Sequence, residues 1–218
     1  MKIGIFDSGR GGTTVMAAIK ELLPGEEYFY IADSENCPYG EKTDDELYKI
    51  VRVNVEKLRD WGAQIVVVAC NTATTRCIVK LRKDYPDLKF VGTEPAIKLA
   101  TDTDAEKILV LATPGTVKSE RMGTLIKENV KSGQTMEIVA CPGLADTIEQ
   151  NLDTQPEKIT RKLEELLTGV GEFDVIVLGC THYSLVKEQL QRFFQAARII
   201  DGNKGVAQEV ANIAQTIR

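Results

Sequence analysis

The sequence predicts an α/β fold with two similar doubly wound parallel-sheet domains, related by a pseudo-twofold axis, and a functional site in the cleft between them. Short apolar runs alternate with longer amphipathic segments along the chain, which is typical of right-handed βαβ units. The runs at 65–69 and 175–178 contain no polar residue, as expected for strands buried on both faces of a parallel sheet. Part of this pattern recurs in the second half of the chain.

Eight apolar runs have the length and the Ile, Val and Leu content of strands. The predicted strands are residues 2–6, 28–31, 64–69, 89–91, 107–111, 136–140, 174–178 and 198–200. Residues 44–61 carry apolar side chains at helical spacing, with Thr43 as the expected N-cap. A further helix is expected over 156–167, because Pro156 suits a first turn and Gly169 follows its end.

Two elements recur in the same order at nearly the same offset. The strand at 2–6 resembles the one at 107–111, and the run that ends at Cys70 resembles the run that ends at Cys180, 110 positions later. Chance explains either pair alone, but both together favour duplication of a half of about 100 residues. We therefore expect one domain of residues 1–95 plus 205–218 and a second of 96–204.

Composition excludes several classes of protein. Lysine and arginine total 27 against 32 aspartates and glutamates, a formal net charge of −5, which suits neither nucleic acid nor an anionic membrane surface. No stretch approaches the ~20 apolar residues of a membrane span, and the N-terminus has no apolar signal core. The five cysteines are odd in number and include no CxxC pair, which argues against disulfides and zinc fingers. The sequence predicts a cytoplasmic protein with free thiols.

Polar residues follow four of the predicted strands, where open α/β sheets bind their ligands. They are Asp7 and Ser8, then Cys70, Asn71 and Thr72, then Thr113, and finally Cys180, Thr181 and His182. Each of the two cysteines precedes a predicted helix start. Unpaired N–H groups and the helix dipole there favour a thiolate and can bind a carboxylate.

The pseudo-twofold axis would bring Cys70 and Cys180 to opposite sides of one cleft. Two weak acids in this arrangement suit removal of a proton from one face of a carbon and its delivery to the other face, which inverts a stereocentre. A free cysteine titrates near pH 8.5, so modest tuning would keep one thiolate and one thiol near neutrality. His182 would accept or donate a proton beside Cys180, and Asp7 would do so beside Cys70.

Five ordered motifs carry a family resemblance over nearly the whole chain. GIFDSGRGG at 4–12, PYG at 38–40, ACNTA at 69–73, EPAIK at 94–98 and GCTHY at 179–183 resemble the motifs of the glutamate racemases, in the cofactor-independent aspartate/glutamate racemase superfamily. The resemblance implies that the two cysteines are the catalytic acid and base, and that L- and D-glutamate are interconverted for bacterial peptidoglycan. It is compatible with a homodimer.

The same resemblance implies which residues surround the substrate. Thr113 and Thr116 would form a threonine pair near it, and Glu149 would be an acidic residue near the second cysteine. The residues implied to contact the amino acid are Asp7, Ser8, Tyr39, Gly40, Asn71, Thr72, Thr181 and His182. No lysine stands in a pyridoxal phosphate context, so we expect no organic cofactor and no metal.

Other interpretations stay open. An aspartate racemase or related isomerase would share the chemistry. The segment from Cys70 to Arg76 fits C-x5-R, in which a loop cradles phosphate and the cysteine attacks phosphorus. Against this, the loop lacks glycine and the second copy at 180–186 lacks the arginine. A non-catalytic ligand-binding module explains the cleft but not the paired thiols, and a zinc centre formed by cysteines and His182 would need unusual spacings.

Overall fold

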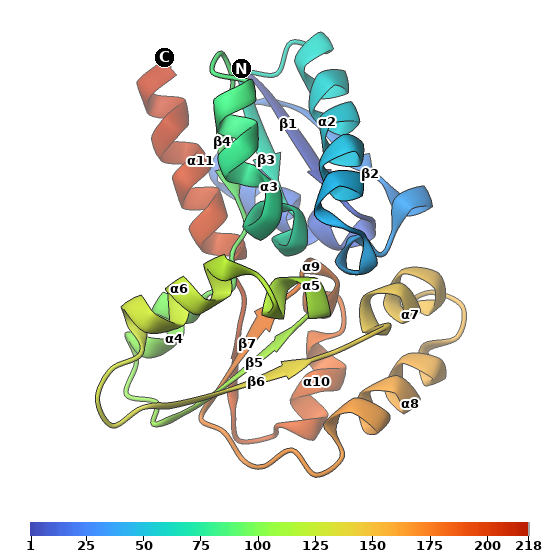
Figure 1. Ribbon diagram of the computed structural model, residues 1–218, viewed down its shortest axis with the longest axis vertical. Coiled ribbons are helices and arrows are strands. Elements are labelled where there is room, and N and C mark those ends of the chain that lie inside the picture. Colours follow the sequence, from blue (N-terminus) through green and yellow to red (C-terminus); the bar gives the residue numbers. More distant parts are fainter. Residues whose placement is uncertain (218) are drawn as a thin grey trace.

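The chain forms two parallel sheets of four strands each, one above the other in Figure 1. The computed structural model describes residues 1–217. The strand order is β2-β1-β3-β4 in the first sheet and β6-β5-β7-β8 in the second. The shared order confirms the predicted α/β fold with two similar parallel-sheet units.

All eight predicted strands are present, and each agrees with its predicted range to within one residue at either end. The strands are β1 (Lys2–Asp7), β2 (Glu27–Ala32), β3 (Ile65–Val68), β4 (Lys89–Gly92), β5 (Lys107–Ala112), β6 (Thr135–Ala140), β7 (Val175–Gly179) and β8 (Arg198–Ile200). Every residue of β3 and β7 is buried, which explains their continuous apolar runs. The edge strands β2 and β6 are half-exposed and carry polar residues.

Helices cover both faces of each sheet (Figure 1). They are α1 (Thr13–Leu22), α2 (Asp44–Asp60), α3 (Asn71–Asp84), α4 (Ile97–Thr101), α5 (Pro114–Val117), α6 (Glu120–Asn129), α7 (Leu144–Asn151), α8 (Pro156–Leu167), α9 (Thr181–Ser184), α10 (Lys187–Phe193) and α11 (Asn203–Ile217). Three 3-10 turns complete the described chain: η1 (Arg10–Gly12), η2 (Ser34–Asn36) and η3 (Tyr39–Glu41).

Local sequence signals explain where the two predicted helices begin and end. Thr43 and Glu46 form a reciprocal capping box at the start of α2, which satisfies two otherwise unpaired N–H groups. Pro156 occupies the first turn of α8, and Gly169 follows the helix with φ +82°, a conformation that glycine adopts without steric cost.

The last helix returns to the first half of the molecule. Val206, Val210 and Ala214 of α11 pack in one apolar cluster with Ile3 and Ile65 of the first sheet. We propose that residues 1–95 with 205–218 form one domain and 96–204 the other; Arg218 lies outside the described residues. No helix within residues 1–217 is long and apolar enough to cross a membrane.

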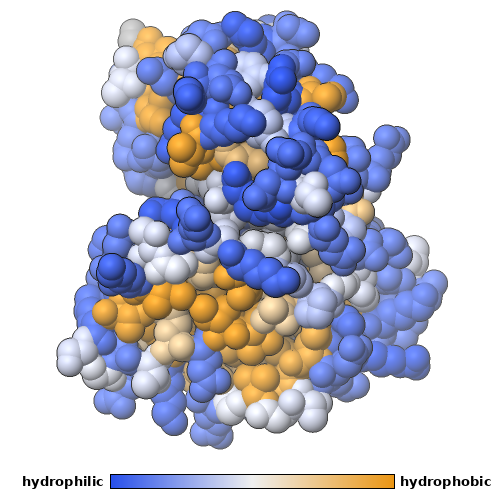
Figure 2. All heavy atoms as spheres, viewed as in Figure 1, coloured by the Kyte–Doolittle hydropathy of each residue, from blue (hydrophilic) through white to orange (hydrophobic). Residues whose placement is uncertain are grey.

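The strand order positions the functional site. In the first sheet β1 lies between β2 and β3, and in the second sheet β5 lies between β6 and β7. The strand order therefore reverses beside β1 and β5, and a crevice forms at the carboxyl end between β1 and β3 and between β5 and β7. In Figure 2 the two halves meet at a narrow waist, whereas apolar side chains gather lower down, over β5 and β6. The carboxyl ends of the central strands face this waist from both sides (Figure 1).

Candidate active site

A small cavity lies between the two halves. It has a volume of about 20 Å³, enough for about one water molecule. Its lining comes from both halves and comprises Ser8, Cys37, Pro38, Tyr39, Gly40, Cys70, Asn71, Thr72, Thr113, Ala145 and Cys180. The two cysteines predicted to face each other therefore line the same cavity, which is too small in this structure to hold an amino acid.

Cys70 follows β3 and is the N-cap residue of α3. Its thiol lies 3.7 Å from the hydroxyl oxygen of Ser8. Asp7, at the end of the neighbouring β1, is fully buried. Its carboxylate accepts the Gly12 N–H at 2.8 Å and the hydroxyl of Thr181, from the other half, at 3.2 Å. The first sheet thus brings a carboxylate close to its thiol, as predicted.

Cys180 follows β7 and is the N-cap residue of α9. Its sulfur lies 3.9 Å from Nδ1 of His182, and Nε2 of that ring lies 2.8 Å from Oε2 of Glu149 on α7. We assign the proton to Nε2, which donates to the carboxylate and leaves Nδ1 free to accept from the thiol. The structure therefore brings together the three residues expected on this side of the site.

Glu149 stays ionised in this arrangement. Burial alone would raise the pKa of its carboxyl, but hydrogen bonds from His182, Ser34 and the Arg10 N–H outweigh burial and hold the pKa at about 2. Asp7 shows the opposite balance, because burial raises its pKa in spite of the donors around it. The two acidic residues thus have different proton affinities although they serve equivalent thiols.

Burial opposes the thiolate form of both cysteines in this closed arrangement, against the expectation that the helix N-termini favour it. Burial, reinforced by the charge of Asp7, raises the pKa of Cys70 to about 12. Burial likewise raises the pKa of Cys180 well above its usual value. Backbone N–H groups at the helix starts do lower these pKa values, but the loss of solvent is the larger effect.

Three threonine hydroxyls meet at the junction of the halves. Oγ1 of Thr72 lies 2.9 Å from that of Thr113 and 3.3 Å from that of Thr116. Asn71 adds an amide oxygen that is buried without a hydrogen-bond partner. The Tyr39 hydroxyl instead donates to Asp33 at 2.5 Å, so Tyr39 lines the cavity without offering its hydroxyl there.

The phosphatase interpretation finds no support in the geometry. Nε of Arg76 lies 2.6 Å from the Asp44 carboxylate, and its Nη2 donates to the carbonyl oxygen of Lys42 at 2.8 Å. The guanidinium is thus engaged by the segment that leads into α2 instead of a phosphate cradle. No group of three or more His, Cys, Asp or Glu side chains within residues 1–217 is arranged to hold a metal ion.

Sequence reasoning missed three residues near the site. Ser34 and Arg10 contact Glu149 from the first half, and Ala145 lines the cavity from α7. The contacts to Glu149 span 115 and 139 positions, and no local pattern marks such pairs. The fold alone brings them together.

Comparison with known proteins gives concordant matches. The family model described as Asp/Glu/Hydantoin racemase matches residues 3–210. The chain is 37% identical over 211 residues to a glutamate racemase of Clostridium novyi, covering 95% of this chain and 81% of that protein. It is 41% identical over 217 residues to a glutamate racemase of a Roseiflexus species, covering 98% and 79%.

Solved structures agree with these sequence matches. Glutamate racemase from Escherichia coli, in complex with L-glutamate and the activator UDP-MurNAc-Ala, superposes with a TM-score of 0.86 at 32% identity, covering 96% of this chain and 80% of that one. The glutamate racemase isoform RacE1 from Bacillus anthracis gives 0.85 at 31% identity, covering 98% and 81%.

Proposed function

The chain belongs to the Asp/Glu/Hydantoin racemase family, and from this we infer that it is a glutamate racemase, an isomerase that interconverts L- and D-glutamate. Its similarity to curated glutamate racemases over nearly its whole length supports this substrate. The product D-glutamate supplies peptidoglycan synthesis, the role of this class of enzyme. We place this reaction in the cytoplasm, because five unpaired cysteines are typical of a reducing compartment.

One observation carries the assignment of the chemistry. Cys70 and Cys180 come from equivalent strand ends of the two halves and line the same cavity. Racemisation needs an acid and a base on opposite faces of one carbon, and exchanging the enantiomer exchanges their roles. Two identical groups related by pseudo-symmetry suit that requirement, whereas a hydrolase or a binding protein would need only one thiol or none.

In the proposed mechanism one cysteine acts as thiolate and removes the α-proton, forming a carbanion-like intermediate. The opposing thiol then delivers its proton to the other face, so that the roles of the two sulfurs are exchanged after one turnover. His182 accepts the Cys180 proton when that side acts as base, and the carboxylate of Asp7 serves Cys70. Because burial raises the pKa of both thiols, we expect the thiolate to form as the substrate binds.

The polar groups around the cavity have hydrogen-bonding capacity that is available to bind an amino acid. The unpartnered amide oxygen of Asn71 suits the α-ammonium group, since a buried acceptor without a donor is costly. The hydroxyls of Thr72, Thr113 and Thr116 and the N–H groups at the start of α3 suit a carboxylate. An ammonium group bound here would also lower the pKa of the nearby thiols.

The proposal is tested by proton NMR of the purified enzyme with L- or D-glutamate in D2O. We expect the α-proton signal to disappear as both enantiomers accumulate. Cys70→Ser and Cys180→Ser should each lower turnover by about 10²–10⁴-fold, the usual contribution of a general acid or base, while Cys77→Ser, in the same core but outside the cavity, should not. Full activity in either active-site variant would contradict the two-base mechanism.

The alternatives give different results in the same preparation. Exchange with aspartate but not glutamate would indicate an aspartate racemase, and binding without exchange would indicate a ligand-binding module. Hydrolysis of an aryl phosphate, lost in Arg76→Ala, would favour the phosphatase. Light scattering of the same sample would decide whether the enzyme is a homodimer.

A further inference from the structure

The carboxylate of Glu149 is shared between the two halves of the molecule. It projects from α7 in the second half, where Oε2 accepts the Nε2–H of His182 at 2.8 Å. The first half supplies the other two donors: the Arg10 N–H reaches Oε2 at 2.8 Å and the Ser34 hydroxyl reaches Oε1 at 2.5 Å. Of these donors, only the Ser34 hydroxyl binds Oε1.

We propose that Ser34 is a positioning residue for proton transfer at Cys180. Its hydroxyl, presented by the first half when the cleft is closed, fixes the Glu149 carboxylate, and this carboxylate in turn holds the imidazole of His182 against the Cys180 sulfur. This inference rests on the proposed racemase function of the site.

The geometry explains why Oε1 needs its own partner. Donors on Oε2 alone would leave the carboxylate free to rotate about its last bond, which would swing Oε2 away from Nε2 of His182. A short hydrogen bond on each oxygen removes that freedom, and bonds to an ionised group are stronger than neutral ones. His182 is only 1% exposed, so its ring has no alternative partner in solvent.

The residue before Ser34 is anchored by several hydrogen bonds. Ser34 begins η2, directly after Asp33, whose carboxylate accepts the hydroxyl of Tyr39 at 2.5 Å and the side-chain amide of Asn54 at 3.0 Å. The Asp33 N–H donates to the backbone oxygen of Asp7 at 3.0 Å. The hydroxyl is therefore delivered to Glu149 by the same framework that carries the Cys70 side of the site.

The charged groups around Glu149 leave this role to Ser34. Arg10 contributes only its backbone N–H, because its guanidinium lies 2.6 Å from Asp153 in a half-exposed ion pair. Ser34 thus links closure of the cleft to the alignment of the thiol–imidazole–carboxylate chain, which an open cleft would leave incomplete.

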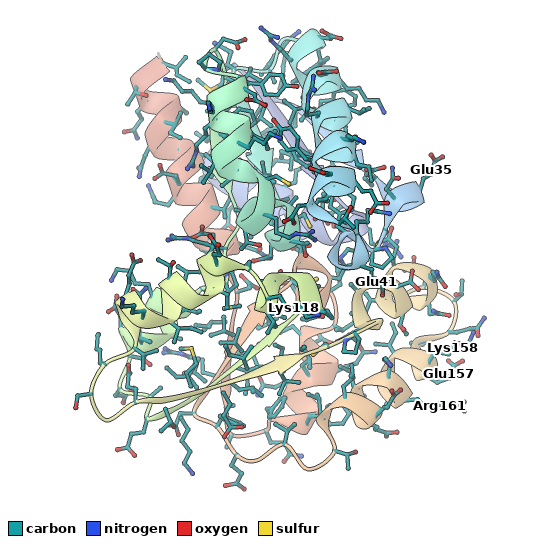
Figure 3. The ribbon with its side chains drawn as sticks, in the orientation of Figure 1. Glu35, Glu41, Lys118, Glu157, Lys158 and Arg161 are labelled. Atoms are coloured by element: carbon teal, nitrogen blue, oxygen red, sulfur yellow. The ribbon has the colours of Figure 1, made fainter. Side chains whose placement is uncertain are left out.

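The test compares Ser34→Ala with Ser34→Thr, which keeps a hydroxyl. Glu35→Ala is the matched control, because Glu35 is the next residue of η2 and points away from the junction (Figure 3). Arg10→Ala is the second control, since it removes the ion pair to Asp153 between the halves but keeps the N–H on Glu149.

We would measure kcat and KM for both enantiomers, and the imidazole N–H signal of His182 by NMR. The chain has one histidine, so an untagged sample gives an unambiguous signal.

We expect Ser34→Ala to lower kcat by about tenfold, the loss of one hydrogen bond to a charged group, with a smaller change in KM. The hydrogen-bonded Nε2–H signal should weaken in this variant and return in Ser34→Thr. Glu35→Ala should match the wild type, and Arg10→Ala should change KM but not the signal.

Two results would overturn the inference. One is a wild-type kcat and an unchanged imidazole signal in Ser34→Ala. The other is an equal loss in Ser34→Ala and Arg10→Ala with the signal intact in both, which would mean that Ser34 only holds the halves together. If the wild type itself fails to exchange the α-proton of glutamate, the proposed function fails, while the NMR comparison still decides whether Ser34 positions His182.

Discussion

Thr181 of the second half donates its hydroxyl to the buried carboxylate of Asp7 in the first half, at 3.2 Å. The exchange is mutual, because the first half donates to Glu149 of the second. Asp7 and Glu149, the acidic residues beside the two thiols, therefore each accept a hydrogen bond from the opposite half. A cleft site built this way assembles its proton-transfer groups only when it closes.

Replacing Thr181 by valine should impair the Cys70 side of the reaction. The change keeps the shape of the side chain but removes a donor from Asp7, whose pKa burial already raises. The pKa of Asp7 should rise further, so the carboxylate form is lost at a higher pH. We expect kcat to fall about 10-fold or more and the acid limb of its pH profile to move upward, with Thr181→Ser restoring both.

Thr124→Val is the matched control for that change, because the Thr124 hydroxyl bonds only its own helix at an exposed site. Its pH profile should overlay that of the wild type. An unchanged profile in Thr181→Val would show that the cross-half donor has no influence on Asp7.

Arg76→Met should loosen the loop that lines the cavity without abolishing catalysis. The guanidinium, only 13% exposed, ties α3 to the Lys42 carbonyl and to Asp44, directly after the turn that carries Gly40. Loss of these bonds should raise KM for glutamate several-fold and leave kcat nearly unchanged, as for a binding contact that is equal in ground and transition states. Asp44→Asn, which keeps the bond to Lys42, should show a smaller rise; a fall in kcat with constant KM would contradict this role.

The strands and the paired thiols could be predicted from the sequence because their signals are local. Fully buried strands such as β3 and β7 must be apolar throughout, and Cys70 and Cys180 mark the same place after each. The contact of Ser34 with Glu149 has no such signal, because it depends on how two separately folded sheets meet.

The pKa values of the two thiols could not be predicted from local sequence patterns either. A helix N-terminus is visible in the sequence and does lower the pKa of a thiol, but the depth of burial that outweighs it at Cys70 depends on how the surrounding elements pack, including the apolar cluster around Cys70. The C-x5-R pattern failed for a similar reason. Spacing gives the position of Arg76 on α3, whereas its nearby partner Asp44 comes from the start of another helix.

Buried thiols away from the site should make the protein less stable at alkaline pH. Burial raises the pKa of Cys77 and of Cys141 from 9.0 to about 12. Well below a pH of about 8.5 both thiols are protonated whether the chain is folded or unfolded, so they add no pH dependence there. Between pH 9 and 12 only the unfolded chain ionises, and the free energy of unfolding should fall by about 1.4 kcal/mol per pH unit for each thiol.

Urea unfolding at pH 8, 9, 10 and 10.5 measures this slope. Cys77→Ala adds a pH-independent cost for the lost side chain but should be less steep above pH 9 by the contribution of one thiol. A slope equal to that of the wild type would mean that Cys77 ionises in the folded protein as readily as in water.

Gly9→Ala should impair proton transfer at Cys180 through a steric contact with Glu149. Gly9 has an extended backbone with φ −173°, which alanine adopts without strain. An added Cβ, however, would lie 2.5 Å from Oε2 of Glu149. That oxygen is held by His182 and by the Arg10 N–H, so the carboxylate must leave these donors or the halves must separate. We expect kcat to fall at least as far as in Ser34→Ala and the imidazole N–H signal of His182 to weaken.

The control is Gly25→Ala, because a Cβ at Gly25 meets no atom within 4 Å. Both substitutions restrict the unfolded chain to the same degree, so a comparison of their unfolding free energies isolates the contact at Gly9. If Gly9→Ala keeps wild-type turnover and the same imidazole signal, the carboxylate of Glu149 has moved without consequence. The chain from Ser34 through Glu149 to His182 would then not control proton transfer at Cys180.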